Sequence, residues 1–388
     1  MNWLLHKLRG DKIIWITVIM IALMSVLAIY SSTSALSHRM QEGDTEHYAL
    51  RHFLLLGGGF VVMFIVHLLN YRLFARVVNL MLFITIPLLI YTISRGSEIN
   101  EAARWVTIFG QSFQPSELAK ITLMIFLAKL LTQRQEVIKD FTEGFLPALF
   151  WVTVICGLIA PADLSTAALM FVASMMVMFV AGVDVKYLGL LVVVAALGTS
   201  ILFNTAKRSG TWQARMTDYK ERIVNPEYEP NYQMTQAYIA TSTGGLFGKG
   251  VGKSTQRNFL PHAYSDFVFA IIVEEYGMVG GTLLLCLYLL LLFRSVSIVT
   301  ASKTFGALMA AGLAFLLVLQ AMVNIGVTIG LLPITGLTLP MISMGGTSIL
   351  FTAVSLGIIL SVSRDVLENK KSGKAAAKAK RSQGFAIN

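Results

Sequence analysis

Charged residues are scarce in this sequence. Asp, Glu, Lys and Arg together make up 13% of its 388 residues, whereas hydrophobic residues make up 55%. A soluble domain carries about 25% charged residues, so the composition excludes a soluble enzyme and a disordered chain. It favours one polytopic membrane domain over the two or three soluble domains that the length alone would suggest.

Cysteines and nucleotide-binding motifs are also lacking. The chain has two cysteines, Cys156 and Cys286, and each lies in an apolar run. They form neither a disulfide framework nor a metal-ligand spacing, so no protein metal site is predicted. No phosphate loop of the GxxxxGK type is present, which argues against a nucleotide substrate. The net charge of +10 does not call for nucleic acid, because cytoplasmic loops of membrane proteins are enriched in Lys and Arg.

Long apolar runs dominate the chain. A transmembrane helix needs about 20 predominantly apolar residues. The runs therefore predict an all-α polytopic membrane protein with about ten transmembrane helices. They fall at 13–32, 53–69, 74–93, 113–131, 145–160, 165–181, 185–206, 266–293, 305–330 and 347–363.

Basic residues at both ends predict the orientation of these spans. Lys7, Arg9 and Lys12 precede the first run, and a Lys/Ala-rich stretch follows the last. The positive-inside rule then places the N and C termini in the cytoplasm, which requires an even number of spans. The predicted domains are a cytoplasmic segment at 1–12, a membrane domain at 13–363 and a basic cytoplasmic tail at 364–388. We expect this tail to be disordered on anionic lipid.

One long loop, 207–265, falls outside the membrane by this count. It carries eight Lys and Arg residues against four acids. Long loops cross the membrane largely regardless of charge, so the basic excess has a neutral explanation. It also suits the attraction of an anionic substrate or headgroup, for which Lys249 and Lys253 are candidates.

Ionisable residues near the outer membrane boundary are candidates for a site, because such groups are costly in a bilayer. Glu117 and Lys120 are three residues apart and share a helix face, so they either neutralise each other or line a cavity. Arg104 is an interfacial anchor or a phosphate contact. Asp163 precedes Ser-Thr, which is typical of a helix cap.

The predicted eighth span begins with Asp266, which is either a helix cap or a catalytic carboxylate. Glu274 and Glu275 follow on the same span, about 12–14 Å deeper along the helix. They need partners there, so we expect one to pair with Lys120 or a cation of the loop and the other to be protonated. The stretch 330–348, which contains Ser343, is rich in Gly and Pro and suits a re-entrant segment or a plain short loop.

Four of these segments, in this order, resemble the SEDS family of shape, elongation, division and sporulation proteins. The resemblance runs from the first span to the last. The compact spacing after Gly250 is more similar to the division branch, FtsW, than to the elongation branch, RodA. The segments are FQPSELAK (113–120), YQMTQAYIATSTGGLFGKGVG (232–252), LPHAYSDFVFAIIVEEYG (260–277) and GLLPITGLTLPMISMGGTS (330–348).

The resemblance implies a peptidoglycan glycosyltransferase that polymerises lipid II on the outer face of the bacterial inner membrane, at the division septum. Its expected partners are a class B penicillin-binding transpeptidase and other division proteins. The implied catalytic base is Asp266, with undecaprenyl pyrophosphate as the leaving group. No cofactor is expected, apart from a possible divalent cation. The predicted substrate-binding residues are Arg104, Glu117, Lys120, Asp163, Lys249, Lys253, Glu274, Glu275 and Ser343.

Three alternatives remain at this stage. The intramembrane charges also suit a lipid II flippase, a transporter that would use them as gates or as a proton relay. A non-catalytic division scaffold and an elongation polymerase of the RodA type are the others. A flippase predicts polar residues along a whole transport path, whereas a polymerase predicts a cluster at the outer face only.

Overall fold

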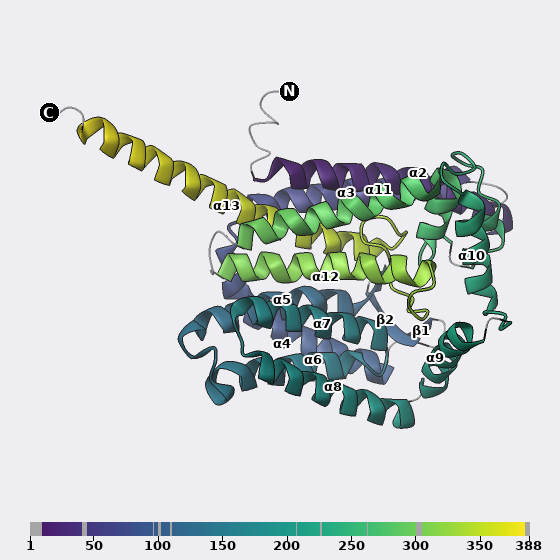
Figure 1. The fold of residues 1–388 in the computed structure, drawn as a ribbon, viewed down its shortest axis with the longest axis horizontal. Helices are drawn as coiled ribbons and strands as arrows, with labels where there is room; N and C mark the ends of the chain where they lie inside the picture. Colours follow the sequence, from purple (N-terminus) through teal and green to yellow (C-terminus); the bar gives the residue numbers. More distant parts are fainter. Residues whose placement is uncertain are drawn as a thin grey trace.

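The protein is a bundle of long helices, seen side by side in Figure 1. The computed structural model describes residues 10–40, 45–95, 97–99, 102–108, 111–206, 208–225, 227–261, 263–299 and 305–384. The bundle helices are α2 (Lys12–Met40), α3 (Thr45–Leu68), α4 (Arg72–Arg95), α5 (Pro115–Gln133), α6 (Leu146–Ile159), α7 (Leu164–Ala181), α8 (Val185–Thr205), α11 (Val268–Val299), α12 (Phe305–Thr328) and α13 (Gly346–Gly384).

The predicted number of spans is confirmed with one qualification. Nine of the described helices are long and apolar enough to cross a membrane. Helix α5 has the length but carries three charged side chains, Glu117, Lys120 and Lys129. It nevertheless packs against α4, α7 and α12, so it completes a bundle of ten helices in the described part of the chain. Hydropathy alone misses this span because of these charges, of which Glu117 and Lys120 are paired inside the protein.

The two ends of the bundle differ. Helix α2 begins, and α13 ends, at the end opposite to α9 (Ser209–Val224) and α10 (Tyr232–Gly244), as Figure 1 shows. This arrangement is what an even number of spans requires. Residues 1–9 of the predicted cytoplasmic N-terminal segment lie outside the described residues. We refer to the end with α9 and α10 as the outer end.

The outer end carries structure that the apolar runs do not predict. A small antiparallel sheet has the order β1 (Ser97–Ile99), β2 (Ala102–Ile108) and β3 (Gln111–Phe113). Helices α9 and α10 lie within the long loop, which was predicted only as rich in turns. Helix α9 buries Trp212 and leaves its charged side chains half-buried or exposed, and a mostly polar helix of this kind belongs outside the bilayer.

A break at Gly277 separates α11 into two helical pieces. Its backbone has φ 68° and ψ −169°, and an added Cβ would lie 2.2 Å from the carbonyl oxygen of Leu246. Only glycine suits both conditions. The piece after the break, 278–299, has 22 residues. At 1.5 Å per residue it spans about 33 Å, which is enough to cross the membrane alone.

The depth of Glu274 and Glu275 below Asp266 stays a prediction, but the contacts of Glu275 are defined. The Glu275 carboxylate accepts a hydrogen bond from Ser31 Oγ. Ser31 lies at the end of the apolar span Lys12–Ser32, near the outer boundary. Both glutamates precede the break at Gly277, and Glu275 lies level with the end of this apolar span.

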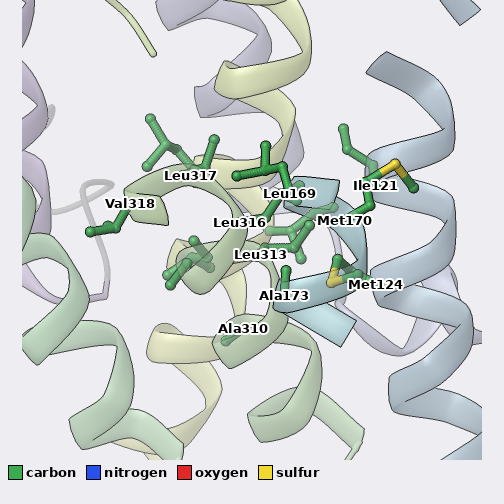
Figure 2. Packing of buried hydrophobic residues seen from close by; sticks show 14 of the residues in the cluster. Ile121, Met124, Leu169, Met170, Ala173, Ala310, Leu313, Leu316, Leu317 and Val318 are labelled. Carbon is green, nitrogen blue, oxygen red and sulfur yellow. The ribbon is translucent and has the colours of Figure 1, made fainter. Parts of the chain in front are cut away.

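The core is centred on α12. In its most apolar stretch 78% of the residues are buried, against 11% for α8. Close approach of α12 to α7 depends on Gly312, where an added Cβ would lie 2.9 Å from the side chain of Val177. Small residues at helix contacts are typical of membrane bundles. Figure 2 shows Ile121 and Met124 of α5 and Leu169, Met170 and Ala173 of α7 packed against Ala310, Leu313 and Leu316 of α12.

The predicted disorder of the basic tail is not what the structure has. Helix α13 continues without interruption from the membrane span to Gly384, and Figure 1 shows it projecting from the bundle. The Ala/Lys-rich composition explains this, because Ala and Lys are strong helix formers. The last four residues, 385–388, lie outside the described part.

The orientation can be tested by cysteine labelling. Glu227 in the outer loop and Lys139 between α5 and α6 are both exposed. With Cys156 and Cys286 replaced, a membrane-impermeant maleimide should label Glu227→Cys in intact cells. It should label Lys139→Cys only after the membrane is permeabilised. Labelling of both positions from the same side would contradict the proposed orientation.

Candidate active site

A cavity of about 530 Å³ lies at the outer end of the bundle. The lining comes from β2, the beginnings of α5 and α7, helix α9, the turn before α11 and the segment between α12 and α13. Four predicted site residues therefore meet in one place, although they are far apart in the sequence. The charged residues of the lining are Arg104, Glu117, Asp163, Arg208, Arg215 and Asp266.

Asp266 lies in the turn just before α11 and is half-buried. Its Oδ1 accepts a hydrogen bond of 2.7 Å from Ser265 Oγ. Among the described residues, no Lys or Arg lies within ion-pair distance of it. Gly336 lies opposite, since a Cβ added there would be 3.5 Å from Asp266 Oδ2. The carboxylate thus borders the cavity without a fixed counter-ion in the described part of the chain.

Asp163 has two roles in the structure. As predicted, it caps α7, because its side chain accepts hydrogen bonds from the Thr166 backbone N–H (3.1 Å) and hydroxyl (2.9 Å). It also forms an ion pair of 3.0 Å with Arg104 of β2. The pair fastens the small sheet to the first turn of α7 and forms one wall of the cavity.

Glu117 and Lys120 neutralise each other, as one of the two predicted alternatives requires. Their side chains are 2.8 Å apart, and both residues are buried. Lys120 Nζ also donates to Gln320 Oε1 of α12 at 2.9 Å, and Gln320 Nε2 donates to the Thr338 carbonyl at 2.8 Å. Glu117 and Gln320 line the cavity and form its polar floor.

Two arginines of the outer loop line the cavity and were not predicted as site residues. Arg208 donates to the Ala162 carbonyl at 2.9 Å, and Arg215 donates to the Ile334 carbonyl at 3.2 Å. Burial lowers the pKa of Arg215, and Arg104 lowers it further, while Asp163 and Asp266 oppose this. An anion in the cavity would stabilise the charged form. The helical character of α9, had it been recognised, could have indicated that Arg215 faces inward.

Lys249, Lys253, Glu274 and Glu275 do not line this cavity. Lys249 forms an ion pair of 2.6 Å with the fully buried Glu274, which also accepts a 3.1 Å bond from the Thr255 backbone N–H. The loop backbone is also hydrogen-bonded to α11 just before its break, because the Lys249 N–H donates to the Glu274 carbonyl at 2.9 Å. Lys253 is exposed. The prediction that a loop cation pairs with one of these glutamates is confirmed for Glu274. Neither glutamate lines the cavity with Asp266.

Ser343 also lies outside the cavity lining. It is 3% exposed, and its hydroxyl donates to the Ser265 carbonyl at 2.5 Å. The structure therefore gives it a contact with the backbone next to Asp266 rather than a place on the cavity wall. The segment that carries it is exposed at Leu331 and Leu332 but buried or half-buried over 333–345, which favours a re-entrant segment over a plain loop.

Metal ligation finds no support in the described residues. They contain no group of three or more His, Cys, Asp or Glu side chains that could hold an ion. Besides Glu117, the cavity has two carboxylates, Asp163 and Asp266. They are not equivalent, because Asp163 is paired with Arg104 and caps α7. We therefore derive no step through a divalent cation.

Comparison with known proteins gives consistent matches along the chain. The family model described as "Cell cycle protein", for FtsW, RodA and SpoVE, matches residues 11–368. Stage V sporulation protein E of Bacillus subtilis is 33% identical over 92% of this chain and 98% of its own. The probable peptidoglycan glycosyltransferase FtsW of Geobacter sp. (strain M18) is likewise 33% identical, with the same two coverages.

Solved structures agree with the fold. The rod shape determining protein RodA of Thermus thermophilus matches with a TM-score of 0.67 and 27% identity, over 92% of this chain and 97% of that one. A chain of a peptidoglycan synthase complex, described in terms of polymerization and crosslinking, matches with a TM-score of 0.70 and 29% identity. It covers 92% of this chain and 98% of its own.

The ion pair of Lys249 yields a stability prediction. Lys249→Ala leaves the buried Glu274 carboxylate without its cation, which should cost about 1–3 kcal/mol. Lys253→Ala, on the exposed neighbouring lysine, is the matched control and should have little effect. Thermal unfolding of the two purified variants measures the difference. Equal unfolding temperatures for both variants and the wild type would contradict a structural role for Lys249.

Proposed function

Because the chain belongs to the FtsW, RodA and SpoVE family of cell cycle proteins, we propose that it is a peptidoglycan glycosyltransferase that uses lipid II. The relatives named as probable peptidoglycan glycosyltransferases support this activity, as does the resemblance to a peptidoglycan synthase complex. The observation that carries the proposal is the cavity itself. It combines a carboxylate that lacks an ion pair among the described residues with several arginines at the outer end of a membrane bundle.

The reaction sets chemical requirements that this cavity meets. Lipid II carries its sugar on undecaprenyl pyrophosphate through an α-linkage, and the product has a β-1,4 linkage, so one inverting displacement is needed. Such a step needs a base for the acceptor 4-hydroxyl, as in inverting glycoside hydrolysis. It also needs cations on the departing pyrophosphate. Asp266 is the base in this proposal, because a carboxylate held by a counter-ion accepts a proton less readily.

Arg208 and Arg215 are better pyrophosphate ligands than the loop lysines. A guanidinium binds phosphate oxygens through two parallel hydrogen bonds. Both arginines line the same cavity as Asp266, whereas Lys249 is paired with Glu274. Arg104 supports the site through Asp163. The cavity volume of about 530 Å³ suits a sugar headgroup, so the lipid tail would remain in the bilayer.

The position of the charges favours polymerisation over transport. The charged lining of the cavity comes from elements of the outer end. Beyond Gln320, α12 continues toward the inner end as the apolar sequence FGALMAAGLAFLLVL (305–319), and most of these side chains are buried in the core. A flippase would need a polar path here. In detergent no bilayer separates two sides. A protein that only transports lipid II would therefore not polymerise it there, whereas a polymerase would.

The same comparisons support a proposal for the partner and the location. We propose a class B penicillin-binding transpeptidase as partner, together with other division proteins, and a place at the septum of the bacterial inner membrane. FtsW and sporulation relatives at 33% identity favour the division branch. An elongation role of the RodA type is the second candidate. Growth after depletion of the cell's FtsW or its RodA, with this chain as the only substitute, distinguishes the two.

Asp266→Asn tests the catalytic assignment. Asn preserves the size of the side chain but cannot take the proton, so polymerisation of purified lipid II should fall by about 10²–10⁴-fold. Glu227→Gln removes an exposed carboxylate of the same loop region and is the control. Unfolding temperature must be unchanged in both variants. A near wild-type rate for Asp266→Asn would show that another group is the base.

Arg208→Ala and Arg215→Ala test the pyrophosphate contact. Loss of one charge-assisted contact to the leaving group should lower kcat/KM for lipid II by about 10–100-fold. Lys220→Ala on α9 changes the net charge equally without touching the cavity lining. An equal decrease for Lys220→Ala would indicate general attraction by the loop instead of a specific contact.

A further inference from the structure

We propose that Ser343 and Asn324 are positioning residues that hold the backbone of residues 264–266, so that the Asp266 carboxylate is presented to the cavity without restraint by a counter-ion. The inference rests on the proposed function of Asp266. It assigns to Ser343 a role other than substrate binding, and it adds Asn324, which the sequence patterns did not indicate.

Three successive carbonyl oxygens carry the argument. Tyr264 O accepts from the Met344 backbone N–H at 2.9 Å, Ser265 O accepts from Ser343 Oγ at 2.5 Å, and Asp266 O accepts from Asn324 Nδ2 at 2.8 Å. These residues precede the start of α11, so they are not part of a regular helix. The carbonyl groups of residues 264–266 are therefore each held by a donor from a segment distant in the sequence.

Both side-chain donors are themselves fixed. Asn324 lies on the central helix α12 and is 2% exposed. Its Nδ2 also donates to the Leu337 carbonyl at 2.7 Å, so one amide group joins the Asp266 turn to the facing segment of the cavity wall. The Ser343 hydroxyl accepts from the Leu339 backbone N–H at 2.7 Å while it donates to Ser265. Neither side chain can move without losing two buried hydrogen bonds.

The turn that carries Ser343 is strained. Met341 has φ 64°, a conformation that non-glycine residues rarely adopt, and it is buried. Its neighbours are held on both sides, since Tyr288 donates to the Pro340 carbonyl at 2.5 Å and Ser25 donates to the Ile342 carbonyl at 3.1 Å. Such a conformation persists only when surrounding contacts enforce it, and it is typical of functional sites.

The bonds restrain the backbone and leave the carboxylate accessible. The Asp266 side chain accepts from Ser265 Oγ alone among the described residues, whereas its own carbonyl and the two before it are occupied. Catalytic groups gain from being held within about 0.5 Å of the productive geometry by supporting hydrogen bonds. An ion pair to the Asp266 carboxylate would also fix its position, but it would make the carboxylate a weaker base.

The test compares Ser343→Ala and Asn324→Ala with Asp266→Asn in one lipid II polymerisation assay. Loss of positioning should lower kcat by about 10–100-fold while KM changes little. Ser355→Ala is the matched control, because this buried serine bonds only within its own helix, at 3.0 Å to the Phe351 carbonyl. Rates are taken per folded molecule, with folded protein measured by thermal unfolding.

Asn324→Asp separates positioning from a merely structural role. A neutral carboxyl still donates one hydrogen bond to a carbonyl, whereas the ionised form donates none. Its rate relative to wild type should therefore fall as pH rises and the introduced carboxyl loses its proton. A relative rate that does not depend on pH would overturn the proposal.

The remaining outcomes are also decisive. Wild-type kcat in both alanine variants, with an inactive Asp266→Asn, would reject positioning and leave the proposed function intact. An increase in KM with unchanged kcat would return Ser343 to substrate binding. A fully active Asp266→Asn would reject the proposed function and with it the role of both residues.

Discussion

A charged side chain inside a membrane protein loses its hydration, and it is stable only where an opposite charge or several donors replace the water. The outer end of this bundle is organised by that constraint. Three buried acids each obtain a cation: Glu117 from Lys120, Asp163 from Arg104 and Glu274 from Lys249. Two of these pairs also join elements that are distant in the sequence, β2 with α7 and the outer loop with α11. Asp266 differs, because it borders a cavity and has no ion pair in the described part of the chain.

This difference divides the outer end into a fixed frame and a reactive group. The frame consists of paired charges, the break at Gly277 and the hydrogen bonds to the carbonyl oxygens of the turn before α11. Within it, Asp266 faces arginines whose charges suit a leaving group. Preorganised polar groups of this kind cost no rearrangement when the reaction occurs, which is why they contribute so much to catalysis.

Much of this arrangement follows from the sequence. Apolar runs locate the spans well, as with 165–181 and helix α7 at Leu164–Ala181, because burial in lipid requires continuous hydrophobicity. The cap at Asp163 and the pair at Glu117 follow from local spacing. Tertiary pairings do not. Nothing local indicates that Lys249 meets Glu274 or that Asn324 reaches Asp266. The motifs of the family resemblance located Asp266, but not the helix α9 that brings Arg215 to it.

The most direct measurement is a structure of the protein with lipid II, or an unreactive analogue, in the acceptor and donor positions. We expect the acceptor 4-hydroxyl within about 2.6–3.2 Å of the Asp266 carboxylate, the reach of a general base. The donor pyrophosphate should contact Arg208 or Arg215. A headgroup bound outside this cavity, or an acceptor hydroxyl directed at another carboxylate, would contradict the account.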